Sequence, residues 1–160
     1  MIQLQEALEE HFEKNCILYD KHTDGINAAI PAPLGNVPTK FRFAEEGQVG
    51  VRCFSPIRIQ ADQKEEIYEL VHQLNDQLQI PRYGIDSKSN LAYCSLILDT
   101  EGCSSGEDRV MNLIGLSLLL VDRLFQAMTK VMFGGQKVGK VIKALEEEDR
   151  GGTKTPRVDP

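Results

Sequence analysis

The chain has 160 residues, a length that suits one domain and lets a folded chain bury roughly two-thirds of its unfolded surface. It is acidic, with 24 Asp and Glu against 18 Lys and Arg, and so lacks the basic footprint that nucleic acid binding normally leaves. The N-terminus lacks the basic and apolar regions of a signal peptide, and the longest apolar run, Val110 to Val121, is too short to span a bilayer. We therefore expect a cytoplasmic protein that binds neither nucleic acid nor a membrane.

The first quarter of the chain predicts one helix followed by mostly irregular structure. Met1 to Glu13 has apolar residues at helical spacing, and a short extended piece, Cys16 to Tyr19, follows it. Lys21 to Thr39 contains several prolines and glycines, so we expect mostly loop there. Within it, Ile26 to Ile30 is the one candidate for an edge strand, and the prolines limit its length.

The middle of the chain predicts two β-hairpins separated by a helix. Phe41 to Phe43 and Val49 to Phe54 both alternate apolar and polar residues around a polar turn, which is a hairpin pattern. Asp62 to Gln79 has a helical apolar period and begins with a capping-box-like arrangement, with its first residue as the N-cap. Tyr83 to Asp86 and Leu91 to Asp99 form the second predicted hairpin.

The longest apolar segment, Ser104 to Gly135, predicts a single long helix with a serine N-cap and a glycine stop. One apolar face at helical spacing consists of Val110, Leu113, Ile114, Ser117, Val121, Leu124, Phe125, Met128, Val131 and Met132. Leu116, Leu119 and Leu120 lie on the far side of that face. Because the helix is apolar nearly all round from Val110 to Val121, it needs cover on more than one side.

The C-terminal part predicts a last helix, Gln136 to about Glu148, and then a flexible tail over 149–160 with no apolar period. The order of elements indicates a single α+β domain over 1–148. We expect an antiparallel β-sheet of about five strands with the helices packed mainly on one face.

The residues that carry chemistry form no recognisable active site. The four cysteines and three histidines are scattered, without the spacing of metal ligands, so we expect no metal, no cofactor and no catalytic residue. Cys103 is the best placed thiol because a helix N-terminus lowers a thiol pKa, but Glu101 and Glu107 beside it raise the pKa. A thiol-dependent enzyme is therefore a minor alternative.

From about Val49 to Glu147 the chain resembles the YbjN-like family, which shares the fold of type III secretion chaperones. The resemblance lies in an ordered set of short segments: Phe54-Ser55-Pro56-Ile57-Arg58-Ile59, Leu74-Asn75 with Leu78, Leu91-Ala92-Tyr93-Cys94, and Val131-Met132-Phe133-Gly134-Gly135. It implies a helix–sheet–helix domain, usually dimeric, whose relatives bind other proteins and catalyse nothing.

We therefore expect a non-catalytic protein-interaction or chaperone-like regulatory module that forms a homodimer and binds a protein client. The candidate interface on the long helix consists of Val110, Leu113, Leu116, Leu119 and Leu120. Arg52 and Phe54, on the outer face of the first hairpin, are candidate client contacts. Two alternatives remain at this point: a small-ligand sensor with a pocket between the sheet and the long helix, and a monomer whose first and last helices cover the leucines.

Overall fold

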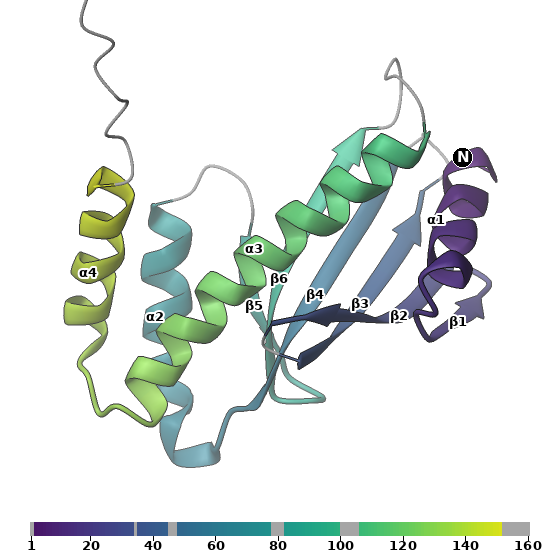
Figure 1. Ribbon diagram of the computed structural model, residues 1–160. Helices are drawn as coiled ribbons and strands as arrows, with labels where there is room; N and C mark the ends of the chain where they lie inside the picture. Colours follow the sequence, from purple (N-terminus) through teal and green to yellow (C-terminus); the bar gives the residue numbers. More distant parts are fainter. Residues whose placement is uncertain (1, 34, 45–47, 78–81, 100–105, 152–160) are drawn as a thin grey trace, which may run out of the picture.

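The computed structural model describes residues 2–33, 35–44, 48–77, 82–99 and 106–151. Within these residues the chain forms a six-stranded antiparallel sheet, in the order β1-β2-β3-β4-β6-β5, and four α-helices (Figure 1). The strands are β1 Tyr19–His22, β2 Gly25–Ala32, β3 Gly35–Phe43, β4 Gln48–Arg58, β5 Arg82–Asp86 and β6 Leu91–Asp99. The helices are α1 Ile2–Lys14, α2 Lys64–Asp76, α3 Gly106–Met132 and α4 Val138–Gly151. The predicted α+β class is confirmed, with six strands where the sequence predicted about five.

The helices gather on one face of this sheet, as predicted. Figure 1 shows α3 lying diagonally across β4 and β6, with α1 beside its first half and α2 and α4 beside its second half. On α1, the buried Phe12 ring lies 5.7 Å from the ring of Phe41 on β3 and 5.5 Å from that of Tyr19 on β1. Val51 on β4 and Leu96 on β6, paired in register, are buried on the same face as Phe41. Burial of these alternate strand residues against α1 and α3 forms the core.

The segment Lys21 to Thr39, predicted as mostly loop, instead contains β2 and most of β3. The predicted edge strand Ile26 to Ile30 is confirmed as part of β2, which is longer and has β1 outside it. The prolines are tolerated because of where the neighbouring strands end. Pro31 lies beyond the end of β1, and Pro38 lies one residue outside the ladder between β3 and β4. Neither missing N–H therefore removes a hydrogen bond from those ladders.

Three further predictions about the ends of elements differ from the structure. The first strand begins at Tyr19, three residues later than the predicted extended piece. Asp62 is not an N-cap, because it lies inside a short 3-10 turn, Ala61–Gln63, that precedes α2. The last helix continues to Gly151, into the predicted tail. The glycine stop of α3 is confirmed: Gly135 has a φ of +59° and the Gln136 N–H donates to the Lys130 carbonyl at 3.1 Å.

Candidate protein-interaction surface

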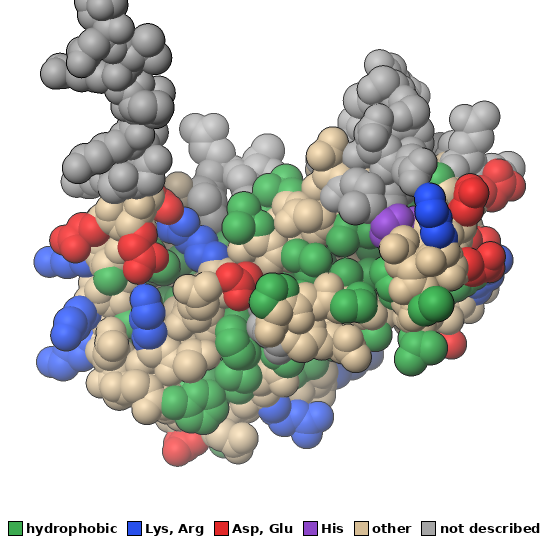
Figure 2. Space-filling model, in the orientation of Figure 1, with side chains coloured by type: hydrophobic (Ala, Val, Ile, Leu, Met, Phe, Trp, Pro, Cys, Tyr) green, Lys and Arg blue, Asp and Glu red, His purple; other side chains and the backbone are tan. Residues whose placement is uncertain are grey.

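A stripe of leucines lies on the solvent side of α3. Leu116 and Leu119 are 44% and 66% exposed, and Leu120 beside them is half-buried. Residues three and four apart on a helix share one side, so the three side chains form one continuous patch. In Figure 2 hydrophobic side chains gather over the middle of the molecule, where α3 crosses the sheet, with charged side chains concentrated to either side. This exposed apolar stripe is the type of surface that marks a protein contact.

The opposite side of α3 is buried in the chain's own core, as its helical period predicted. Seven of the predicted positions are buried along with Leu113: Ile114, Ser117, Val121, Leu124, Met128, Val131 and Met132. Leu113, which we also expected at the interface, is only 2% exposed and packs in this core. The side chain of Val110 lies outside the described residues. The surface available to a partner therefore comes from Leu116, Leu119 and part of Leu120.

A glycine lies beside the leucine stripe. Gly115 is exposed in the interior of α3, and a Cβ built on it would meet no atom within 4 Å. Glycine inside a helix costs about 0.5–1 kcal/mol relative to alanine. The packing of this chain does not require a glycine at position 115, because the space beside its Cα is open. A glycine does allow the backbone of a second element to approach a helix closely.

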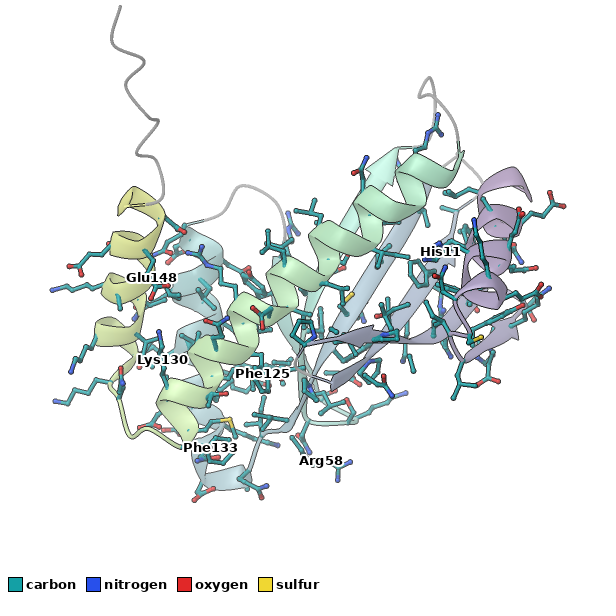
Figure 3. The ribbon with its side chains drawn as sticks, in the orientation of Figure 1. His11, Arg58, Phe125, Lys130, Phe133 and Glu148 are labelled. Atoms are coloured by element: carbon teal, nitrogen blue, oxygen red, sulfur yellow. The ribbon has the colours of Figure 1, made fainter. Side chains whose placement is uncertain are left out.

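Polar contacts fix the C-terminal half of α3 to the neighbouring helix α4. Arg123 donates two hydrogen bonds of 2.8 Å to the two carboxylate oxygens of Asp149, and this bonding lowers the pKa of Asp149. Lys130, about two turns further along α3, extends toward Glu148, with 3.8 Å between Nζ and Oε1 (Figure 3). Both pairs join α3 to α4, so they hold the end of α3 that follows the leucine stripe in a fixed orientation.

The outer face of the sheet, away from α1 and α3, carries the second group of predicted residues. Arg52 is exposed on this face, as expected for a client contact. Phe54 points to the same face but is 4% exposed, because the Tyr93 ring lies 5.8 Å away and the Lys40 ammonium lies 5.1 Å from its centroid. Sequence reasoning missed Lys40, although it alternates with the buried Phe41 in the same hairpin. Phe54 is therefore shielded from a partner, and Arg52 and Lys40 are not.

The two thiols in the sheet are not arranged for nucleophilic chemistry. Cys53 on β4 and Cys94 on β6 are paired in register and buried, and burial raises the pKa of Cys53 and raises that of Cys94 to about 12. Cys103, which the sequence predicted to be the best placed thiol, lies outside the described residues. The residues that the structure describes contain no group of three or more His, Cys, Asp or Glu positioned to hold a metal ion.

Residues 4–130 match the model of a protein family, YbjN, described as "Putative bacterial sensory transduction regulator". The chain belongs to the YbjN family. Searches of curated proteins and of solved structures return no match. The description of the YbjN family is a regulatory one, and YbjN is not a known family of enzymes. In the described part of the chain, no helix is both long enough and apolar enough to cross a membrane.

Proposed function

We propose that this YbjN-family protein is a non-catalytic, cytoplasmic regulatory module that acts through contacts with other proteins and forms a homodimer through α3. The observation that carries the proposal is the exposure of Leu116 and Leu119 on a helix whose opposite side is buried on the sheet. The open space beside Gly115 supports it, because a second α3 helix can approach there. The regulatory description of the YbjN family agrees with a role that needs no catalytic residue.

The size of the stripe predicts a weak, reversible dimer. Full burial of a leucine contributes about 1.5–3 kcal/mol, so the exposed fractions of Leu116 and Leu119 provide roughly 2–3 kcal/mol per protomer. In a two-fold symmetric dimer both copies contribute, which gives roughly 3–7 kcal/mol. Association costs at least about 4 kcal/mol in lost freedom. The leucines alone thus offset only the lower end of this cost, and close packing over Gly115 must add the rest.

The test is the mass in solution of a Leu116→Glu/Leu119→Glu double variant. We expect the wild type to show a concentration-dependent dimer in light scattering and sedimentation, and the double variant to be a monomer. Because both leucines are exposed in the protomer, the far-ultraviolet circular dichroism of the variant should match that of the wild type. Leu18→Glu is the matched control: Leu18 is 79% exposed but lies away from α3, so this variant should still dimerise.

Two results would count against the interface. If the double variant remains dimeric, the dimer contact lies elsewhere. If the wild type is monomeric at millimolar concentration, the proposal of a dimer is wrong. Unfolding of the double variant would mean that these leucines belong to the core of the protomer.

A further inference from the structure

The outer face of the sheet carries a row of three cations that crosses four strands. Lys40 on β3 is directly opposite Arg52 on β4, Arg52 is opposite Ser95 on β6, and Ser95 is opposite Arg82 on β5. All three cations are exposed. Neighbouring strands lie about 4.8 Å apart, so the row spans about 14 Å from Lys40 to Arg82. A positive row of this length is unexpected on a chain with a net charge of −6.

The three cations of this row lack ion-pair partners within the described residues. No carboxylate there lies within 4.0 Å of Lys40, Arg52 or Arg82. The charge of Lys40 does help to lower the pKa of Asp86, after the stronger effects of hydrogen bonds from Ser89 and Lys88, but no ion pair joins the two. Two like charges directly opposite on neighbouring strands destabilise a sheet. The row therefore retains uncompensated positive charge at a cost to the folded chain.

The aromatic rings on this face support the cations from below. The Arg52 guanidinium carbon lies 4.3 Å from the centroid of the Tyr93 ring, and the Lys40 ammonium lies 5.1 Å from that of Phe54. Stacking on a ring holds a long side chain in place and leaves its N–H groups free to donate outward. The same contacts cover the ring faces, so neither ring is open for a nucleic acid base to stack on it.

A hollow beside the row adds an apolar contact. It has a volume of about 350 Å³ and is lined by Lys40, Arg42, Gly50, Val51, Arg52, Ser95 and Ile97. The Arg42 side chain is already engaged, with Nε 3.0 Å from an oxygen of Asp24, so it shapes the hollow without offering free charge. Ile97, by contrast, is 66% exposed at the rim. A ligand seated here meets unpaired cations on one side and an aliphatic side chain on the other.

We propose that this row binds an extended acidic segment of a partner protein. Carboxylates of the segment would pair with Lys40, Arg52 and Arg82, and one apolar side chain would contact Ile97. An extended chain rises about 3.3 Å per residue, so four or five residues cover the row. The exposed Ile97 favours a peptide, which offers carboxylates and an apolar group together, over an inorganic polyanion. This inference rests on the proposed protein-interaction role for its choice of ligand, but not on the dimer, since α3 covers the other face of the sheet.

The test is a titration with a short fluorescein-labelled peptide in which glutamate alternates with serine around a central leucine. We expect fluorescence polarisation to show binding that weakens as salt is raised, and no binding of the same peptide with glutamine in place of glutamate. The Lys40→Gln/Arg52→Gln double variant should bind the acidic peptide about tenfold more weakly or worse. Its thermal midpoint should change little, because removal of the like-charge pair offsets the loss of the two cation–ring contacts.

Matched controls separate this site from general charge effects. Lys140→Gln/Lys143→Gln removes two lysines exposed on α4 and should leave the affinity within twofold of the wild type. The Leu116→Glu/Leu119→Glu variant should bind the peptide like the wild type even as a monomer. The proposal of peptide binding and the proposal of dimerisation are therefore tested independently. Equal binding by the Lys40→Gln/Arg52→Gln variant, or no binding by the wild type, would overturn the proposal. Displacement of the peptide by inorganic polyphosphate or oligothymidylate at lower concentrations than by unlabelled peptide would overturn the choice of ligand.

Discussion

Replacement of Gly115 by alanine should have opposite effects on the stability of the protomer and on the proposed self-association. A Cβ at this position meets no atom within 4 Å and lies on the exposed side of α3, so the protomer gains helix propensity without a clash. The gain is about 0.5–1 kcal/mol in the free energy of unfolding. For a domain of this size, that corresponds to a rise of about 1–4 °C in the thermal midpoint.

In the proposed dimer, the same methyl group would lie where the second helix approaches. An added methyl group in a close-packed contact costs about 1–3 kcal/mol, so we expect the dimer dissociation constant to rise about tenfold or more. Urea unfolding at low protein concentration measures the first effect, and sedimentation over a range of concentrations measures the second. Gly139→Ala on α4 is the matched control, because a Cβ there also meets no atom within 4 Å and Gly139 is far from the leucine stripe. This control should leave the dimer unchanged.

The two measurements test different parts of the reasoning. If Gly115→Ala destabilises the protomer at concentrations where no dimer forms, the space beside Gly115 is not open. If the variant dimerises as tightly as the wild type, the contact between protomers does not include Gly115, whatever happens to stability.

Two further predictions concern the sheet. Gly25→Ala should destabilise the chain by several kcal/mol or prevent folding, because φ is +157° there and a Cβ would lie 1.9 Å from the Phe41 carbonyl oxygen; near-wild-type urea unfolding would contradict this close approach. Cys53 and Cys94 should resist a thiol reagent at neutral pH until urea unfolds the chain, because burial raises the pKa of both thiols, whereas the exposed Cys16 should react at once. Mass spectrometry of the labelled peptides measures both rates, and rapid labelling of Cys94 in the native protein would show that its site opens.

The long helix shows how much of the candidate surface a periodic pattern can predict. The helical period correctly separated the buried side of α3 from the leucines at 116 and 119, because a helix on a sheet must bury one side along its whole length. The dimer hypothesis also assigned Leu113 to the interface, although the helical period places it on the apolar face, and Leu113 is buried. The apolar stripe of α3 is wide, and only the positions of the sheet and of α1 decide where its covered part ends.

The strands of the first hairpin show where local patterns stop being informative. Alternation placed Arg52 and Phe54 together on the outer face, but it did not reveal that Tyr93 and Lys40 cover Phe54. Those neighbours come from strands β6 and β3. The sequence of one strand does not reveal which residues of a neighbouring strand will lie opposite its own. The cation row is invisible for the same reason, because Lys40, Arg52 and Arg82 meet only across paired strands.

The sequence by itself determined the α+β class, the four helices within the described residues and the buried side of α3, because each follows from apolar spacing within one element. The tertiary structure alone decided that the proline-rich segment forms strands, since Pro31 and Pro38 are acceptable only where the neighbouring strands end. It also decided which leucines of α3 stay exposed and which cations align. These features depend on contacts between residues far apart in the chain, and local spacing carries no information about such contacts.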